Sequence, residues 1–216
     1  MEELTNEFRK RNKKRLYIKY TFKEIKKILK KKQWKKVRIE ELEQDITKCI
    51  MELEKDADYG ENDYKKHALC NSIFPGIAAY QILQKYGFTK DEAYYILENV
   101  FESIAKLAGM IYNMLDLLPN GYKLIRKSLW NDMKGKNRKC WETDFLQDDD
   151  NGFAYRVNKC IFVDVPSENS CSEISKLYCK NDTYCFRGLH RHVKWKRTQT
   201  LGEGGNCCDF VFEKVK

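Results

Sequence analysis

The residues best suited to chemistry gather in the last third of the chain. Cys179 and Asp182 stand three residues apart in a stretch with helical periodicity, so they share one helix face. Arg197 precedes, and Cys208 follows, a glycine-rich turn with the sequence "GEGG" at 202–205. A thiolate can attack an electrophilic carbon, a carboxylate can accept a proton, and a guanidinium can bind a carboxylate through two hydrogen bonds. These residue types indicate a hydrolytic site or a ligand-binding site.

Strand alternation predicts that Arg197 lies on an apolar face of a sheet. In the predicted strand 192–201, one face holds Val193, Trp195, Arg197 and Leu201. In the predicted strand 207–215, Cys208 shares the apolar face with two phenylalanines, and Asp209 points away from that face. If the two strands pair through the glycine turn, Arg197 and Cys208 line the same side of the sheet. A guanidinium there needs a partner, which is either an internal carboxylate or the carboxylate of a ligand.

The chain has nine cysteines, an odd number that does not suit a closed disulfide framework. Cys160 falls in a long predicted strand, 153–165, and is expected to converge with Cys179, Cys208 and Asp182 between helix and sheet. Three interpretations follow: packed inert thiols, a reactive thiolate, or a metal site in which Cys160, Cys179 and Cys208 hold zinc. Alternation favours Cys208 over Cys207 as the key thiol. The remaining cysteines are predicted to be packing residues: Cys49, Cys70, Cys140, Cys171 and Cys185.

Three other features could be functional sites, and each also has a purely structural interpretation. His190 stands just before the third predicted strand, where it is either structural or able to reach the mouth of a site. The acidic run "DDDNG", 148–152, predicts a hairpin turn, because a calcium loop around Gly152 would have unsuitable residues at both ends. The "GEGG" run precedes a strand, whereas a phosphate-binding loop leads into a helix, so these glycines are predicted to allow a tight turn.

The elements that must position these residues divide into helices followed by strands. Helices are predicted around Ile18–Leu29, over 39–55, over 63–86 with a break at Pro75-Gly76, from the Thr89–Glu92 capping box to about Leu118, and over 122–133. From Cys140 to Val215 the pattern predicts a β-β-α-β-β unit. The expected fold class is α+β, with N-terminal helices packed on a four-stranded antiparallel sheet. The domain prediction is a basic helical arm, 1–58, and an α+β domain, 59–216, with helices over 63–134.

Charge is concentrated near the N-terminus. The chain carries a formal net charge of +9, but the stretch 8–38 holds sixteen basic residues and one acidic residue, so the remainder is mildly acidic. Nucleic-acid binding by the core is therefore not expected. The basic amphipathic helix is either a solvated helix docked on the body or a helix that contacts a partner or a membrane surface. Because the N-terminal residues include no apolar signal segment, the expected location is cytoplasmic.

Several motifs together resemble the L-2-amino-thiazoline-4-carboxylic acid hydrolase family. They are "NKC" at 158–160, "YCKND" at 178–182, "GLH" at 188–190 and, most specific, "RTQTLGEGGNCCDF" at 197–210. The helical stretch 66–97 is similar in texture, and the likeness covers roughly 60–216. The matched positions are Cys160, Cys179, Asp182, Arg197, Thr200, Cys208 and Asp209. The chain departs from the family pattern at His190, where family members tend to have proline.

The resemblance implies a hydrolase that opens the ring of L-2-amino-thiazoline-4-carboxylate to give N-carbamoyl-L-cysteine. Under this hypothesis Arg197 binds the substrate carboxylate, with Thr200 and His190 as further substrate-binding residues, and Asp182 acts as base. Either Cys179 or Cys208 attacks the substrate, or these two hold a zinc with Cys160. The competing hypothesis is a small-molecule- or metal-binding module similar to 4-vinyl-reductase-type domains, which holds a ligand without hydrolysis.

Overall fold

The computed structural model describes residues 16–31, 37–133 and 140–215. The chain forms two compact units, 1–104 and 105–216, and the division falls within the long helix α6 (Lys90–Leu117). The predicted boundary near residue 58 thus does not coincide with this division. Residues 8–15 and 32–36 of the basic stretch, and residues 134–139, lie outside the described residues.

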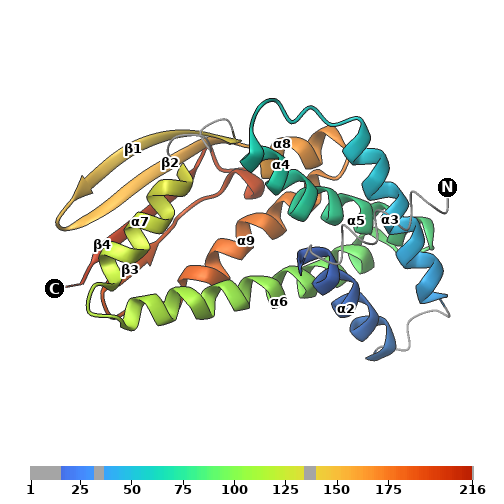
Figure 1. The fold of residues 1–216 in the computed structure, drawn as a ribbon, viewed down its shortest axis with the longest axis horizontal. Helices are drawn as coiled ribbons and strands as arrows, with labels where there is room; N and C mark the ends of the chain where they lie inside the picture. The colour runs from blue at the N-terminus through green and yellow to red at the C-terminus, as the bar shows by residue number, and fades with distance from the viewer. Residues whose placement is uncertain (1–15, 32–36, 134–139, 216) are drawn as a thin grey trace. The chain divides into compact units, whose positions relative to one another are not determined.

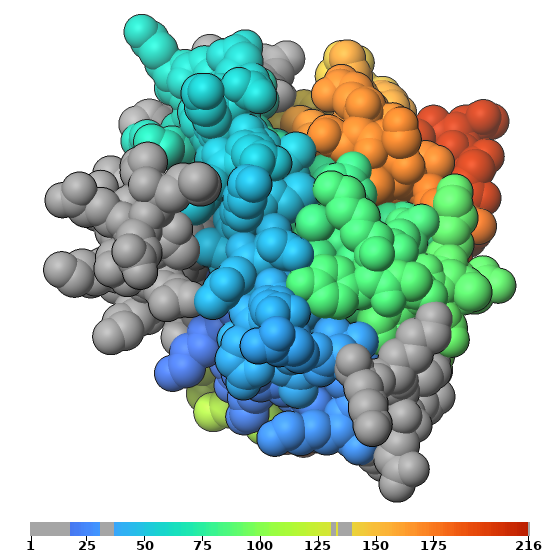
Figure 2. All heavy atoms as spheres, turned by 90° about the vertical axis from the view of Figure 1, so that its right-hand side faces the viewer, coloured from blue at the N-terminus to red at the C-terminus, as the bar shows by residue number. Residues whose placement is uncertain are grey.

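Two amphipathic helices begin the first unit (Figure 1). Helix α2 (Leu16–Lys31) buries Ile18, Ile25 and Leu29, which confirms the predicted apolar stripe. Helix α3 (Ile39–Lys55) has the predicted bounds, and it buries Leu42, Ile46 and Ile50. The exposed side of α3 is seen as the light blue atoms across the middle of Figure 2.

The predicted break at Pro75 appears as a change of helix type rather than as a loop. Helix α4 (Asp63–Ala68) leads into a π-helical turn (Leu69–Ile73), which continues as α5 (Phe74–Lys85). Proline lacks a backbone N–H, and a wider turn before it accommodates the missing hydrogen bond without ending the helix.

The start of α6 confirms the predicted capping box. The backbone N–H of Glu92 donates to Thr89 Oγ1 over 3.2 Å, and the Thr89 N–H donates to the Glu92 carboxylate over 2.7 Å. Two N–H groups that helix geometry leaves unpaired are thereby satisfied. No helix among the described residues is both long enough and apolar enough to cross a membrane.

The second unit is built on a four-stranded antiparallel sheet in the order β1-β2-β4-β3. The strands are β1 (Trp141–Asp149), β2 (Gly152–Cys160), β3 (Val193–Lys196) and β4 (Cys208–Lys214). Phe153 and Phe212 stack on one face, 4.5 Å between ring centroids. Helix α7 (Gly121–Met133) packs Trp130 against Phe153, and α9 (Ser175–Phe186) packs Phe186 against Phe212. The fold class α+β is confirmed, with helices on this face of the sheet.

The predicted β-β-α-β-β order is only partly correct, because the second strand is shorter than 153–165. It ends at Cys160, and Ile161–Glu168 forms a further helix, α8. Cys160 pairs with Trp141, the first residue of β1, so the residues after Cys160 have no partner on that strand. Apolar β-branched residues favoured a strand, but a strand without a neighbour leaves its backbone groups unpaired, whereas a helix satisfies its own. Pro166 also lacks the N–H that a ladder needs.

The single inserted helix of the predicted unit is therefore two helices, and the sequence of the first suggested a helix start at Ser167 that the structure does not show. Ser167 lies inside α8, where its hydroxyl donates to the Val163 carbonyl, and it caps nothing. The chain turns at Ser170, whose φ is 56°, and α9 begins only at Ser175 after a short 3-10 turn, η3 (Ser172–Ile174).

The β1–β2 hairpin is confirmed, but its turn is held by a side chain. The Asp149 carboxylate accepts the N–H groups of Asn151 and Gly152. Gly152 does not need a positive φ; it is required because a Cβ there would lie 2.5 Å from the Phe212 carbonyl oxygen. The glycine thus permits β2 and β4 to approach each other.

Asp116, near the end of α6, organises the entry into β3. It is 1% exposed, and its two carboxylate oxygens accept four backbone N–H groups, those of His190, Arg191, His192 and Val193, over 2.7–3.0 Å. Burial alone would raise the pKa of Asp116, but the four donors outweigh it and hold the pKa below its ordinary value. The Asp116 carboxylate therefore provides the hydrogen-bond acceptors for the backbone N–H groups of residues 190–193.

We predict that Asp116→Ala lowers the free energy of unfolding by at least about 3 kcal/mol, because buried N–H groups lose their acceptor. The measurement is urea denaturation at pH 7 followed by tryptophan fluorescence, since Trp130, Trp141 and Trp195 all lie in this unit. The wild-type contribution is present above the carboxyl pKa of the unfolded chain and is lost as the pH falls through the lower folded value, below about 4.

The matched control is Asp150→Ala at the exposed tip of the hairpin, for which a change within about 0.5 kcal/mol is expected. An equal loss of stability in the two variants would contradict the role assigned to Asp116.

Candidate functional site

Helix α9 places three polar residues on one face. Ser175, Cys179 and Asp182 follow one another at intervals of four and three residues, the spacing of a single helix face. Ser175 is 2% exposed and Cys179 is 7% exposed, so this face is turned into the protein. The predicted proximity of Cys179 and Asp182 is confirmed.

Arg197, just after β3, is the residue that holds this face. Its Nη1 donates to Asp182 Oδ2 over 2.8 Å, and its Nη2 donates to the Cys179 carbonyl over 2.8 Å and to Thr183 Oγ1 over 3.1 Å. The Arg197 side chain is 7% exposed. Of the two partners considered from the sequence, the structure shows the internal carboxylate.

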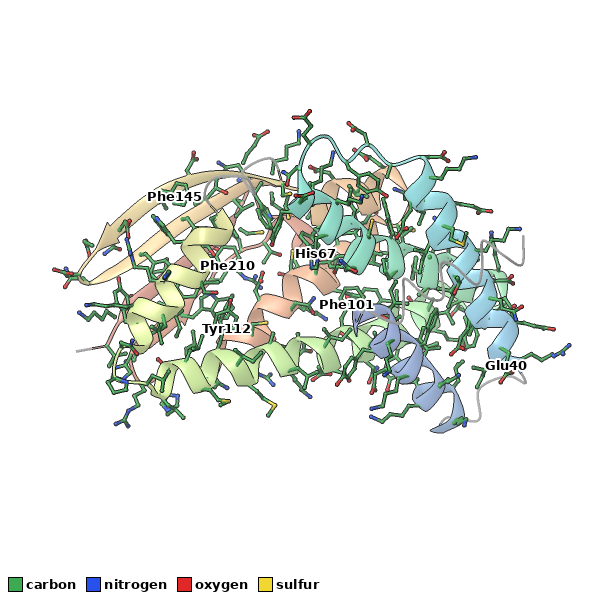
Figure 3. All side chains as sticks on the ribbon, viewed as in Figure 1. Glu40, His67, Phe101, Tyr112, Phe145 and Phe210 are labelled. Carbon is green, nitrogen blue, oxygen red and sulfur yellow. The ribbon has the colours of Figure 1, made fainter. Side chains whose placement is uncertain are left out.

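Aromatic rings complete the environment of Arg197. Its guanidinium carbon lies 5.3 Å from the Trp195 ring centroid and 5.5 Å from that of Phe210. Phe210 is labelled in Figure 3, where it lies among the side chains of the second unit. The prediction that Arg197 occupies the apolar face of its strand is therefore confirmed, and the cation is stabilised by both ion pairing and cation–π contact.

The thiol of Cys179 is surrounded by hydrogen-bond donors. It accepts from the Cys208 thiol, the Gly202 backbone N–H and the Thr200 hydroxyl. The bond from Cys208 is the largest influence, and together these donors lower the pKa of Cys179 to about 7 although burial and Asp182 oppose them. The pKa of Cys208 is raised, because its proton is held by Cys179. In this arrangement the Cys208 thiol donates to the Cys179 sulfur, which favours the ionised form of Cys179 over that of Cys208.

Two glycines of the "GEGG" turn have different roles. Gly204 has a φ of +88°, which confirms the predicted tight turn. Gly202 is required for space, since a Cβ there would lie 2.8 Å from the Cys179 sulfur and 3.0 Å from the Ser175 carbonyl oxygen. The absence of a side chain lets the Gly202 backbone N–H approach the sulfur.

The segment after β3 is not a strand, which corrects the predicted extent 192–201. Asp209 accepts the backbone N–H groups of Thr198 and Gln199 and the Thr198 hydroxyl, and so draws this segment away from the ladder. A 3-10 turn, η4 (Leu201–Glu203), then follows. Asp209 points away from the apolar face as predicted, and its role is to shape this loop.

Thr200 begins η4 and faces the thiols. It is 2% exposed, its Oγ1 accepts the Glu203 N–H over 3.2 Å, and the same oxygen lies 2.9 Å from the Glu203 carboxylate. The hydroxyl has one proton, which it donates either to Glu203 or to the Cys179 sulfur. Thr200 therefore joins the loop to the reactive thiol.

Asp182 is held in an unusual electrostatic state. Burial raises its pKa to about 6, and the nearby Arg197 guanidinium opposes this rise. The Asp182 side chain as a whole is partly exposed, although its carboxylate is desolvated. A carboxyl with this pKa is mostly ionised at pH 7 and can accept a proton.

Cys160 lies at the end of β2, close enough to influence Cys179 and Cys208 electrostatically. Burial raises the pKa of Cys160 to about 12, while N–H groups of Phe162 and Trp141 donate to its sulfur. Cys179 and Cys208 are thus in contact, and Cys160 and Asp182 lie near enough to act on the cysteines electrostatically. Within the described residues, however, no three Cys, His, Asp or Glu side chains are grouped so as to hold a metal ion. Zinc binding stays a prediction.

Comparison with known families adds to this geometry. The family model described as L-2-amino-thiazoline-4-carboxylic acid hydrolase matches residues 66–212, which is more than half of the chain. The chain belongs to this family. No curated protein matches the chain. The hydrolase-family match includes every residue of the thiol and arginine cluster.

His190 is not part of the cluster that this hydrolase-family chain assembles. It precedes β3, whereas Arg197 follows it, so the length of the strand, about 13 Å, separates them. The His190 ring contacts the Gly188 carbonyl over 2.8 Å, and the residue lines an open hollow with Arg191, His192 and Val215. Its role in substrate binding stays a prediction.

Sequence reasoning missed Ser175. Its hydroxyl is buried and has no hydrogen-bond partner in the part of the chain that the structure describes, although its carbonyl abuts Gly202, the glycine that contacts the thiol. The interval of four residues to Cys179 was the available signal, but it depends on knowing that α9 begins at Ser175. A buried hydroxyl without a partner is costly and indicates a place for a polar group of a ligand.

Some of the cysteines predicted to be packing residues have polar contacts. Cys49 lies 3.8 Å from Gln81 Oε1, and the Cys185 thiol donates to the Ala105 carbonyl over 3.6 Å. Burial raises the pKa of Cys185 to about 12, so it stays protonated. Cys185 is on the same helix as Cys179 and provides a matched control for it.

We predict that thiolate absorbance near 240 nm reveals one thiol with a pKa near 7, and that this signal disappears in Cys179→Ser. Cys208→Ala removes the donor that lowers the pKa of Cys179, so the titration midpoint moves to higher pH. Cys185→Ser leaves the midpoint unchanged. A midpoint near 7 that survives Cys179→Ser would assign the thiolate to another residue.

Proposed function

We propose that the protein is a thiol-dependent hydrolase that opens a small cyclic amidine such as L-2-amino-thiazoline-4-carboxylate, giving N-carbamoyl-L-cysteine. The observation that carries the proposal is the Cys179 thiol, whose pKa is lowered to about 7 by three donors. A nucleophile that is ionised near neutral pH suits attack on the carbon between sulfur and nitrogen. The family match supports the substrate class.

The proposed reaction consumes one water. The Cys179 sulfur attacks C2 of the ring, the bond from C2 to the ring sulfur breaks, and the leaving sulfur takes a proton. Cys208 is the nearest donor, since its thiol already points its proton at Cys179. Water then adds to C2 of the enzyme-bound isothiourea and loses one proton to the base. The bond from C2 to the Cys179 sulfur breaks, and the remaining hydroxyl proton is lost as the carbonyl of the product forms.

Asp182 and Arg197 serve this reaction in different ways. Asp182, with its pKa raised to about 6 by burial, is the proposed base for the attacking water. Arg197 fixes Asp182 and the α9 backbone through the three hydrogen bonds described above. A role for Arg197 in binding the substrate carboxylate stays a prediction, and it requires N–H groups beyond those three.

A second candidate function rests on the burial of the thiols. Cys179 and Cys208 are 7% and 6% exposed, which suits a module that encloses a ligand as well as an enzyme. Such a module binds a small molecule at the same cluster without covalent attack. Turnover separates the two functions.

The decisive experiment mixes reduced protein with L-2-amino-thiazoline-4-carboxylate and follows N-carbamoyl-L-cysteine by mass spectrometry. We expect turnover by the wild type and by Cys185→Ser, and a loss of at least about a hundredfold in Cys179→Ser. Cys185 is the control because it lies on the same helix with a protonated thiol.

The outcomes divide the candidate functions. Equal turnover by Cys179→Ser and the wild type would overturn the proposed nucleophile. Absence of product from folded wild type, with saturable binding of the substrate in calorimetry, would favour the binding module.

We further predict that Ser175 contacts the substrate. Ser175→Ala removes a buried hydroxyl that has no hydrogen-bond partner within residues 16–31, 37–133 and 140–215, so the free energy of unfolding is unchanged or rises slightly. If the hydroxyl binds a polar group of the substrate, KM rises about three- to tenfold while kcat changes less. The measurement is steady-state kinetics beside thermal denaturation.

Ser172→Ala, at an exposed position of the preceding turn, is the control and leaves both constants unchanged. Unchanged KM in Ser175→Ala would show that this hydroxyl does not reach the substrate.

A further inference from the structure

The second half of α6 presents a large apolar face to the surface. Six large hydrophobic side chains there are 42–68% exposed: Leu107, Met110, Ile111, Met114, Leu117 and Leu118. We call this set the α6 stripe. Over 105–120 the charged residues are Lys106, which is exposed, and Asp116, which is buried, so the stripe is nearly free of charge. Isolated exposed hydrophobic residues are ordinary, but a contiguous patch of this kind marks an interaction site.

The opposite face of the same helix is firmly packed within the second unit. Gly109 lies so close to α9 that a Cβ would be 2.5 Å from the Tyr184 carbonyl oxygen. Tyr112, labelled in Figure 3, packs edge-on against Phe186 with 5.0 Å between centroids. The Cys185 thiol donates to the Ala105 carbonyl. These contacts fix the rotation of α6, so the stripe is a preformed surface.

The spacing of the stripe is that of a helix pairing with another helix. Leu107, Met110, Met114 and Leu117 recur at intervals of three and four residues, the a and d positions of a heptad. Ile111 and Leu118 widen the seam on one side. A regular seam over more than one heptad fits a straight helix better than it fits an irregular loop.

We propose that the α6 stripe is a self-association surface that pairs with the same stripe of a second copy of this chain. With exposed fractions averaging a little over half, six such side chains offer on the order of 600 Å² per copy, against about 800 Å² per partner in a standard interface. The stripe thus supplies most of the area of a stable dimer. Its lack of charge suits an apolar interface core.

The pairing is antiparallel. In a parallel pair both Lys106 residues lie at the same end of the seam, away from the helix C-termini, whereas in an antiparallel pair each lies beside the C-terminal end of the other helix, where cations are favoured. The two-fold axis then passes between residues 112 and 113 of each helix. Leu107 faces Leu118 of the second copy, and Ile111 faces Met114. A two-fold interface of this kind is isologous and closes at the dimer.

The test measures the mass of the full-length, reduced protein by sedimentation velocity over a range of concentrations. We expect a dimer for the wild type and at least a tenfold increase in the dissociation constant for Ile111→Lys and for Met114→Glu, each of which buries a charge in the seam. Mixing these two variants restores the dimer, because antiparallel pairing places Lys at 111 opposite Glu at 114. Parallel pairing does not join these positions.

The control is Leu146→Lys on β1, where the wild-type side chain is 53% exposed but lies outside the stripe; its dimer is unchanged. A monomeric wild type at all concentrations would overturn the proposal. Co-flotation of a monomeric wild type with anionic lipid vesicles, abolished by Ile111→Lys, would assign the stripe to a membrane surface and also overturn it. Failure of the mixture to dimerise would overturn the antiparallel arrangement.

Discussion

The ion pair between Arg197 and Asp182 is the constraint on which the site depends. Arg197 comes from the end of β3, and Asp182 comes from α9, so the pair joins the sheet to the helix that carries the thiol. The same guanidinium donates to the Cys179 carbonyl, and this bond fixes the position of Cys179 relative to the sheet. Because the Arg197 guanidinium is buried against two aromatic rings, loss of Asp182 would leave its charge without compensation, so the arrangement is strongly specified.

The reactive character of Cys179 follows from backbone geometry as much as from side chains. A loop without a Cβ at Gly202 brings an N–H to the sulfur, and the start of β4 brings Cys208. Asp209, the next residue on β4, shapes the loop from the other face of the strand. Cys208 and Asp209, adjacent residues of one strand, thus act on the surroundings of the Cys179 thiol from opposite sides of the sheet.

Much of this site was predictable because strand alternation and helix spacing are local rules. They placed Arg197 on the aromatic face, Asp182 beside Cys179, and Asp209 on the opposite side. The end of β2 was not predictable from local sequence. Ile161 could continue the strand only if β1 extended beyond Trp141 and provided a residue for it to pair with. Asp116 and Ser175 were missed for a similar reason, because one binds a segment 74–77 residues away and the other is defined by the lack of a partner.

The single proton of Thr200 links the charge of the thiol to the shape of the loop. When Cys179 is ionised, its sulfur is the stronger acceptor for the hydroxyl, and the Glu203 carboxylate loses that donor. When the sulfur is protonated, the hydroxyl donates to the Glu203 carboxylate instead, while Thr200 Oγ1 accepts the Glu203 N–H in either state. The charge of one thiol therefore decides whether the side chain of Glu203, within the 3-10 turn, receives a hydrogen bond.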